Sequence, residues 1–485
     1  MQAFWLCLVI AIARLGALAA NTTELFFDES QYWAWSKELA FGYYSKPPLI
    51  AWLIAASGSV CGDSEFCVRL PSVLMHAATS LIIYFLGARL YGARAGLWAS
   101  LTYATLPGVA VSSGIISTDV PLLLCWAISL LAFVWLLQAP SWGGAMVLGL
   151  ALGLGLNAKY AMAYFVLCAA LYFIVAPAQR TLLRRPHLWL ALALAAALIA
   201  PNLMWNSAHQ FATFAHTADN AKWTQSFVNP GKALEFIGAQ FGVMGPILFG
   251  TLLAVVWRAR SNLRAISEPD RLLLAFSLPI LLIVVCQAFL SRAHANWAVA
   301  AYISATVLVT GHLLRPEHRT WMKASYAING AVCILIAIAT SLAGGLKFPG
   351  VGDPFARMMG NKALAADVIS VLDNARSSGT PYAAVLSDER ELTASLIYYA
   401  RSEPTPILAW RGEGRPRDHF ELTRDYAASQ LQPVLLVSQR SEVSNVTGAF
   451  ANVESVEAKR SPAAKASTPL RPLRFYKLSD YRGRP

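Results

Sequence analysis

Long apolar stretches separated by short polar loops make up most of the chain up to about residue 345. Each stretch approaches the roughly 20 residues that an α-helix needs to cross a bilayer. The predicted spans cover residues 3–20, 68–88, 95–113, 119–138, 143–158, 160–177, 188–205, 235–257, 272–290, 295–314 and 322–344. The pattern predicts an all-α polytopic membrane protein with about 11 transmembrane helices.

Basic residues gather in alternate loops between these spans. With a cytoplasmic N-terminus, one side receives the arginine-rich loops near residues 89–94, 180–185, 258–271 and 315–323. The other side receives loops with few basic residues, at 21–67, 114–118, 159, 206–234 and 291–294. The positive-inside rule places the first set in the cytoplasm. Reading 143–177 as one element would turn the later arginine clusters outward, so we predict two spans there.

The first span can also be read as a signal peptide, because Ala17, Leu18 and Ala19 resemble a cleavage site. It lacks a basic leading segment, and Arg14 interrupts its apolar run, so we expect a retained helix. Either reading leaves residue 21 outside the cytoplasm.

Within the first outer loop, residues 29–41 are predicted to form an interfacial helix that Gly42 ends. Its apolar face would carry Tyr32, Trp35 or Ser36, and Leu39. Leu49–Ala56, which follows two prolines, is too short to span a bilayer.

Charge becomes denser after about residue 345, and the apolar runs shorten. Strands are predicted over 382–387, 406–410, 433–438 and 474–478, with a helix over 389–400. Residues 461–470 read as a flexible loop. We therefore expect two domains: a membrane domain over 1–344, with a catalytic first loop over 21–67, and a small periplasmic α/β domain over 345–485.

Composition supports a membrane protein, because 56% of the residues are hydrophobic and only 14% are charged. A soluble domain carries about 25% charged residues. The net charge of +12 resides mostly in short loops and a C-terminal segment, which argues for membrane orientation and against nucleic-acid binding. Of seven cysteines, only Cys61 and Cys67 flank a polar loop, where they could pair in an oxidising compartment.

Polar groups converge on the non-cytoplasmic side from distant loops. Ionisable residues at membrane spans are costly unless they are paired or hydrated, so they are functional candidates. The set comprises Asp28, Glu29, Lys46, Asp119, Lys159, Asn206, His209, Arg292, His294 and Asn296.

Asp28 has two interpretations. With Gln31 three residues later and Phe27 before it, Asp28 matches a helix-capping box. It also suits a general base that takes a proton from a hydroxyl group. Glu29 fits either an acidic first helical turn or a substrate contact.

Lys46 precedes two prolines and reads either as a lysine that reaches lipid headgroups or as a clamp for a leaving phosphate. Asp119 opens a span, where it would orient an acceptor or pair with a lysine. Lys159 lies between apolar runs and needs an anionic partner. His209 and His294 suit ligands, hydrogen-bond donors or ordinary structural roles.

The aromatic residues of the first loop suit an interface belt or stacking on a sugar. They are Trp33, Trp35, Tyr43 and Tyr44. No cysteine or histidine cluster has structural zinc spacing.

An ordered set of motifs resembles the bacterial polyprenyl-phosphate-sugar glycosyltransferases of GT-C fold. The motifs are DESQYWAW, YYSKPPL, STDVPLLL, NAKY, PNLMWNSAHQFATF and HANWAVAAY. This protein-mannosyltransferase-like group includes the aminoarabinose transferase of lipid A. The resemblance covers residues 1 to about 345 well and the C-terminal domain loosely.

The resemblance implies periplasmic transfer of one sugar from a polyprenyl phosphate, with inversion at the anomeric carbon. It matches Asp28 to the catalytic-loop aspartate, Lys46 to a lysine on the carrier phosphate, Asp119 to a second aspartate and Lys159 to a cavity lysine. Ser45 and Gln31 replace a metal-binding carboxylate and a basic residue of the aminoarabinose enzyme. Both changes argue against aminoarabinose as the sugar and leave a divalent metal open.

DESQYWAWS with YYSKPPLIAW is most similar to members that place galacturonic acid on lipopolysaccharide core or lipid A. We therefore predict a galacturonosyl transferase of the bacterial inner membrane whose partners are its lipid-linked donor, its acceptor and membrane lipids. Its predicted catalytic residues are Asp28 and Asp119. Its predicted substrate-binding residues are Glu29, Tyr32, Tyr44, Lys46, Lys159, His209, Arg292, His294 and Asn296.

Three alternatives remain open: a protein O-glycosyltransferase, a lipid-linked sugar transporter or flippase, and a structural or sensing protein that binds envelope glycans. A transporter predicts a repeat and polar groups at mid-membrane. The sequence contains no evident repeat, and its polar groups lie at the ends of spans.

Overall fold

The computed structural model describes residues 2–221, 228–260, 266–346, 352–457 and 473–483, and the chain divides into two compact units. The first comprises Met1–Ala19, Lys46–Gly62 and Arg69–Ile338. The second comprises Ala20–Ser45, Asp63–Val68 and Ala339–Pro485. The first polar loop is thus divided between the two units, and most of it groups with the C-terminal segment.

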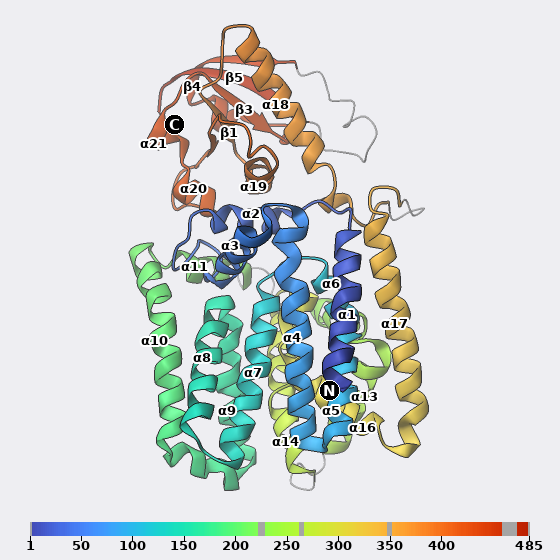
Figure 1. Cartoon of the computed structure of the whole chain (residues 1–485). Coiled ribbons are helices and arrows are strands. Elements are labelled where there is room, and N and C mark those ends of the chain that lie inside the picture. The colour runs from blue at the N-terminus through green and yellow to red at the C-terminus, as the bar shows by residue number, and fades with distance from the viewer. Residues whose placement is uncertain (1, 222–227, 261–265, 347–351, 458–472, 484–485) are drawn as a thin grey trace. The chain divides into compact units, whose positions relative to one another are not determined.

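The first unit is built from helices (Figure 1). Its α-helices are α1 (Gln2–Ala19), α3 (Leu49–Cys61), α4 (Glu65–Tyr91, in this unit from Arg69), α5 (Ala93–Ala104), α6 (Pro107–Ser113), α7 (Asp119–Gln138), α8 (Trp142–Ala158), α9 (Tyr164–Val175), α10 (Pro186–Ala208), α11 (Ala212–Ala221), α12 (Pro230–Met244), α13 (Pro246–Ala259), α14 (Glu268–Ala275), α15 (Leu278–Leu290), α16 (Ala301–Leu313) and α17 (Arg319–Ser341, here to Ile338). Short 3-10 helices are η1 (Tyr160–Ala163), η2 (Pro177–Arg184), η3 (Ala295–Ala298) and η4 (Pro316–His318).

Among the described residues, six helical stretches are long and apolar enough to cross a membrane. They are Gln2–Ala19, Glu65–Tyr91, Asp119–Gln138, Pro186–Ala208, Glu268–Leu290 and Pro316–Ser341. A seventh is added if the bent pair α12 and α13 is one span. The prediction of a helical polytopic membrane protein is confirmed, while several of the predicted spans correspond to shorter apolar helices such as α8 and α16.

The stretch predicted as a single span over 235–257 is not one continuous helix. α12 and α13 meet there at 119°. Gly245 joins them with a φ of +95°, and Pro246 begins the second helix. A β-carbon at Gly245 would also press against the side-chain amide of the buried Asn329, so both the conformation and the space at this bend favour glycine. The predicted span 95–113 is likewise divided, into α5 and α6.

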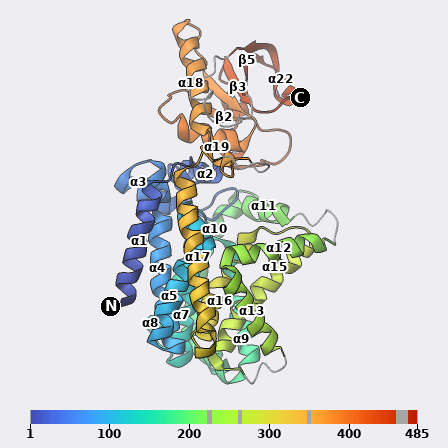
Figure 2. The ribbon, with the colours of Figure 1, turned by 90° about the vertical axis from the view of Figure 1, so that its right-hand side faces the viewer.

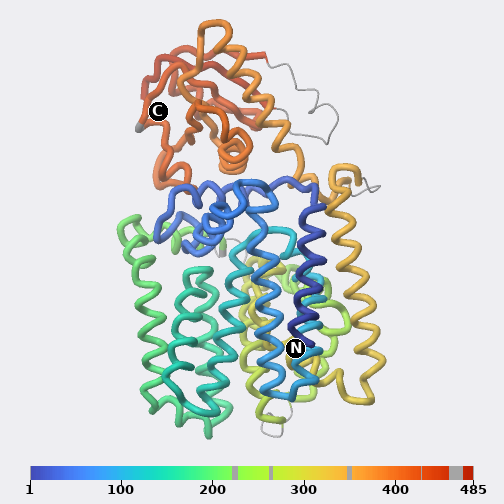
Figure 3. The backbone as a smooth tube through the Cα atoms, viewed as in Figure 1, coloured from blue at the N-terminus to red at the C-terminus, as the bar shows by residue number. Residues whose placement is uncertain are grey.

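The core of the first unit surrounds α7 and α16, whose residues are buried on nearly all sides. Trp126 and Phe133 of α7 pack edge-on or tilted against Phe165 and Phe276. α8 lies between α7 and α10, as the green-teal part of Figure 3 shows. This packing fixes the ends of α7 and α8, where the candidate residues of this unit lie.

The second unit contains a five-stranded mixed sheet in the order β2-β1-β3-β5-β4. The strands are β1 (Ala384–Ser387), β2 (Ile407–Ala409), β3 (Val434–Ser438), β4 (Phe450–Val456) and β5 (Arg474–Tyr481). β1 pairs in parallel with β2 and β3, whereas β5 runs antiparallel to β3 and β4. The predicted C-terminal α/β fold is therefore confirmed.

Helices cover this sheet (Figure 2). One apolar cluster joins the sheet to α18 (Asn361–Ser377) and α19 (Arg390–Tyr399). A second cluster holds the other side chains of β1 and β3 against residues of α21 (Tyr426–Ser429) and α22 (Ser444–Thr447). The C-terminal segment also contains the 3-10 helix η5 (Ala356–Met358) and α20 (His419–Thr423).

The predicted helix and four predicted strands of this domain are present, at shifted ends. The sequence interpretation missed α18 and β4. Most of β4 is exposed, so its sequence lacks the alternation that a half-buried strand shows. The predicted loop over 461–470 lies outside the described residues.

Residues of the first polar loop form part of the second unit. Their helix, α2 (Phe27–Ser36), packs against α19. Trp33 Nε1 donates to Asp63 Oδ1 at 2.8 Å, and the Tyr399 hydroxyl donates to Glu65 Oε1 at 2.7 Å. The predicted interfacial helix over 29–41 is wrong, because α2 ends at Ser36 and its last eight residues are all buried. Cys61 and Cys67 are both disulfide-bonded.

Candidate active site

Asp28 lies in the first turn of α2 and does not cap the helix. Phe26 occupies the N-cap position, and its backbone N–H donates to Glu29 Oε2 at 2.9 Å. The predicted capping role of Asp28 with Gln31 is therefore wrong, because the N-cap lies two residues earlier, at Phe26, and Glu29 supplies the closing carboxylate. The Asp28 side chain is left 38% exposed and is available for chemistry.

Arg390 is the ionic partner of Asp28. Its Nη1 lies 3.3 Å from Asp28 Oδ1 and 3.4 Å from Gln31 Oε1. Its guanidinium also lies 4.7 Å from the centre of the Phe27 ring. Arg390 is the first residue of α19, where the helix dipole disfavours a positive charge, and the sequence interpretation missed it. No local signal relates position 390 to position 28.

The aromatic residues of the first loop belong to the interior of the second unit. Trp35 stacks on Tyr43 at 4.6 Å and 3°, and Tyr32 packs against Trp35 at 5.3 Å. The Tyr44 hydroxyl donates to the Pro416 carbonyl at 2.7 Å. Burial raises the pKa of Tyr43 to about 12. These contacts give Tyr32 and Tyr44 packing partners within the protein.

Asp119 forms a separate polar cluster in the first unit. It begins α7, and its Oδ1 accepts from Lys159 Nζ at 2.6 Å. Its Oδ2 accepts from Asn296 Nδ2 at 2.7 Å. Lys159 follows α8 and Asn296 lies in η3, so three helix ends converge. The carboxylate is 8% exposed and both oxygens are engaged, which explains how Lys159 is tolerated between apolar runs.

Two further predicted residues lie beside this cluster. Partial burial, with the positive charges of Arg292 and Lys159, lowers the pKa of His294. The imidazole is therefore neutral near pH 7. Within the described part of the chain, the buried Arg292 Nε has no hydrogen-bond partner. Lys159 and Arg292 therefore supply the positive charge here, and Arg292 Nε is a spare donor beside the neutral His294.

His209 and Lys46 are placed differently. His209 Nδ1 lies 2.8 Å from the Trp205 carbonyl, and its ring stacks on Trp205 at 4.0 Å. It is thus held by its own helix end. Lys46 is partly buried in the turn that precedes α3. Asn206 bonds to the Tyr160 hydroxyl at 3.1 Å.

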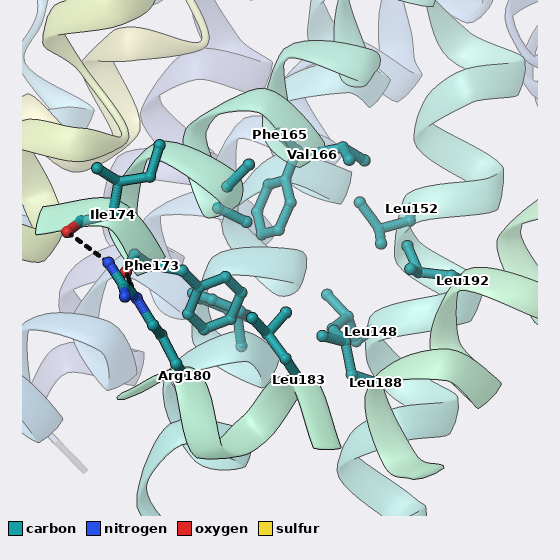
Figure 4. A pocket seen from close by; sticks show the side chains of 13 residues that line it. Leu148, Leu152, Phe165, Val166, Phe173, Ile174, Arg180, Leu183, Leu188 and Leu192 are labelled. Atoms are coloured by element: carbon teal, nitrogen blue, oxygen red, sulfur yellow. Dashed lines mark hydrogen bonds between the residues drawn. The ribbon is translucent and has the colours of Figure 1, made fainter. Parts of the chain in front are cut away.

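An apolar cavity of about 380 Å³ lies among α7, α8, α9, η2 and α10 (Figure 4). Phe133, Leu148, Phe165 and Leu192 are among its lining residues. Its one charged lining residue, Arg180, donates to the carbonyls of Phe173 and Ile174. Phe133 lies roughly 20 Å along α7 from Asp119, at 1.5 Å per residue. The cavity is therefore apart from the Asp119 cluster.

The described residues offer few ligands for a bound metal. Across those ranges, no three His, Cys, Asp or Glu side chains come close enough to hold an ion. Ser45 stands where the resemblance expects a metal-binding carboxylate, and a hydroxyl is a poorer ligand for a divalent cation.

Comparison with known proteins agrees with this architecture. Residues 45–205 match the sequence model of a family described as dolichyl-phosphate-mannose-protein mannosyltransferase. The chain is 37% identical over 410 residues to lipid A galacturonosyltransferase RgtD of Rhizobium johnstonii, with 84% of each protein covered. It is 32% identical over 216 residues to the undecaprenyl phosphate-alpha-4-amino-4-deoxy-L-arabinose arabinosyl transferase of Pseudomonas aeruginosa, covering 40% of this chain and 38% of that one.

Among solved structures, ArnT from Cupriavidus metallidurans bound to undecaprenyl phosphate has a similar fold. The TM-score is 0.67 at 16% identity, with 98% of this chain and 97% of that chain covered. The oligosaccharyltransferase of Archaeoglobus fulgidus gives a TM-score of 0.56 at 13% identity, covering 89% of this chain and 67% of that one. At these identities the likeness concerns the fold alone.

The helical membrane fold and these matches define a polytopic membrane glycosyltransferase. The chain belongs to the glycosyltransferase family that includes lipid A galacturonosyltransferase RgtD. The prediction of a membrane enzyme of this family is confirmed.

Proposed function

We propose that the chain transfers galacturonic acid from a polyprenyl phosphate to lipid A or lipopolysaccharide core at the periplasmic face of the bacterial inner membrane. The observation that carries this proposal is the 37% identity to a lipid A galacturonosyltransferase along 84% of both proteins. The positively charged cluster at Asp119 supports a phosphate-bearing donor.

The leaving group in this reaction is the carrier phosphate. The acceptor oxygen attacks the anomeric carbon in line, and the bond from that carbon to the phosphate oxygen breaks, which inverts the configuration. Negative charge develops on the phosphate, and cations placed in advance stabilise it. We assign this role to Lys159 and Arg292, with Lys46 as a further phosphate contact. Asp119 holds Lys159 in place through the 2.6 Å ion pair.

Asp28 is the proposed general base. Its carboxylate is partly exposed, is not needed to close α2, and makes one ionic contact among the described residues, at 3.3 Å. It can therefore accept the acceptor hydroxyl proton as the new bond forms. If the acceptor is a phosphate group, no base is required, and Asp28 positions the acceptor instead.

The topology proposed with this function has about 11 spans, with the shorter apolar helices crossing together with the six long ones. The loops near residues 89–94, 180–185, 258–271 and 315–323 face the cytoplasm by the positive-inside rule. The membrane domain then runs to about residue 344, and the α/β domain is periplasmic. Reporter fusions after residues 140, 185 and 345 test this orientation, because the first two must report cytoplasm and the third periplasm.

Protein O-glycosylation is the second candidate, because residues 45–205 match a protein mannosyltransferase family. Mass spectrometry of lipid A and lipopolysaccharide from a deletion strain separates the two. Loss of one hexuronic acid, restored by the wild-type gene, supports our proposal. An unchanged glycolipid with a lost protein modification would favour the alternative, and a lost hexose or pentosamine would change the sugar.

A further inference from the structure

The contact between Asp28 and Arg390 joins a candidate base to a charged group that the reaction as proposed does not use. The two side chains are 38% and 30% exposed, and one pair of atoms is in contact. Exposed ion pairs of this kind contribute little to stability and are easily exchanged. The pair is therefore poorly suited to a purely structural role.

Arg390 makes two further contacts on the same side. Its guanidinium lies over the Phe27 ring at 4.7 Å, and Nη1 donates to Gln31 Oε1 at 3.4 Å. A second guanidinium, of Arg357, lies 5.0 Å from the neighbouring Phe26 ring. Two positive charges thus border the start of α2, next to the candidate base.

The other edge of the Arg390 guanidinium remains available. Within the described residues, Nε and Nη2 of Arg390 make no hydrogen bond to the protein. These two nitrogens form the planar fork that binds a carboxylate through two parallel hydrogen bonds. A lysine at this position could offer only a point charge.

We propose that Arg390 is a binding residue for the carboxylate of a uronic acid donor sugar, which it bridges to Asp28. This proposal rests on the proposed galacturonosyl transfer and names the group that selects an acidic sugar. An anionic sugar beside Asp28 would bring two like charges together, which is unfavourable. A guanidinium between the sugar carboxylate and Asp28 offsets that repulsion. A neutral sugar would not require such a cation.

The test compares two donors on the purified full-length protein: polyprenyl phosphate carrying galacturonic acid, and the same carrier bearing galactose, which has a neutral group in place of the carboxylate. Arg390→Gln should raise KM for the acidic donor by roughly 10- to 100-fold, since a charge-assisted contact is lost. The galactose donor should be used as before or better. For the acidic donor, the KM of Arg390→Lys should fall between those of the wild-type protein and Arg390→Gln, because lysine keeps the charge and loses the planar fork.

Arg424→Gln is the matched control, because Arg424 forms a comparable exposed ion pair with Glu38 at 2.6 Å in the same unit. It should leave both donors unaffected. An equal loss with both donors in Arg390→Gln, confined to kcat, would overturn the proposal and make Arg390 a positioning residue for Asp28. An unchanged KM for the acidic donor in both Arg390 variants would also overturn it.

A binding measurement separates this inference from the proposed function. If the wild-type protein transfers neither sugar, the function fails, but binding of galacturonic acid 1-phosphate and galactose 1-phosphate can still be compared by thermal unfolding. Stronger stabilisation by the acidic compound, lost in Arg390→Gln, supports the carboxylate site. Equal stabilisation of the wild-type protein by both compounds contradicts it.

Discussion

Asp28 and Asp119 both lie in the first turn of a helix, yet their surroundings differ. Asp119 has an 8% exposed side chain and binds Lys159 and Asn296 at 2.6 and 2.7 Å. Asp28 has a 38% exposed side chain, and in the part of the chain that the structure describes it has one ionic contact, at 3.3 Å. A fully engaged carboxylate cannot take a proton without losing its partners, whereas a loosely held one can. The comparison assigns a holding role to Asp119 and a reactive role to Asp28.

The largest expected effect is on catalysis at Asp28. Asp28→Asn should lower kcat for a hydroxyl acceptor by about 10²- to 10⁴-fold, the usual contribution of a positioned base. Folding should be retained, because Glu29 rather than Asp28 closes the helix. Single-turnover transfer in liposomes measures the rate, with Glu38→Gln as an exposed acidic control. A fully active Asp28→Asn enzyme would remove the base assignment.

Asp119 should matter more for stability. Asp119→Asn leaves the Lys159 charge without its partner and should lower the free energy of unfolding by about 3 kcal/mol. A double variant that lacks both the Asp119 and the Lys159 side chains should lose less stability than the two single variants lose together, because no unpaired charge remains. Unfolding in detergent measures all three proteins. Simple additivity would contradict the paired role of Asp119.

Lys46 should affect the use of the donor. Lys46→Ala should raise KM for the lipid-linked sugar about tenfold and change kcat less, because one charge-assisted contact to phosphate is lost. Lys232→Ala is the matched control, since Lys232 forms an exposed pair with Glu235 in the same unit. Unchanged kinetics with the carrier would exclude the clamp role.

Glu29 provides a comparison between adjacent carboxylates. Glu29→Ala removes the acceptor for the Phe26 N–H and should lower the free energy of unfolding by about 1 kcal/mol. Glu29→Gln should restore most of that loss, because its amide oxygen still accepts. Thermal unfolding checks both variants. If alanine and glutamine were equally harmful, the negative charge rather than the hydrogen bond would be what matters.

The smallest effect is a pH dependence from His294. Its pKa in the folded protein lies below the usual value of about 6.5, so the unfolded chain binds protons more readily. Stability should therefore fall as the pH drops below about 6.5 toward the folded-state pKa, and rise again as the pH is restored. His294→Gln should flatten this part of the profile. The free energy of unfolding, measured from pH 5 to 8 in both proteins, tests this direction. A steeper dependence on pH in His294→Gln than in the wild-type protein would contradict it.

Local patterns predicted the helices well, because apolar stretches of about the length of a membrane span can be recognised directly in the sequence. Each of the eleven predicted spans falls largely on helices, although several are interrupted. Averaging the apolar character over 235–257 concealed the bend at Gly245 and Pro246. The helix over 29–41 was misjudged because α19, which is distant in sequence, covers α2. The amphipathic spacing of residues 29–41 alone could not reveal that α19 packs on this helix.

The candidate site divides in the same way. Sorting loops by charge placed Asp119, Lys159 and Asn296 on one side of the membrane, and the structure brings these three together. Their specific pairing depends on how α7, α8 and η3 pack. Arg390 could not have been predicted as the partner of Asp28, because the two positions are hundreds of residues apart and neither segment carries a local sign of the other.

Parallel measurement of turnover and donor affinity in Asp28→Asn and Asp119→Asn tests the central claim most directly. We predict that Asp28→Asn loses turnover while it binds the lipid-linked donor no more weakly than the wild-type protein does. Asp119→Asn should instead lose donor affinity and stability, and keep a larger share of its turnover at saturating donor. If both variants lost turnover and affinity to the same extent, the division of roles between the two aspartates would be wrong.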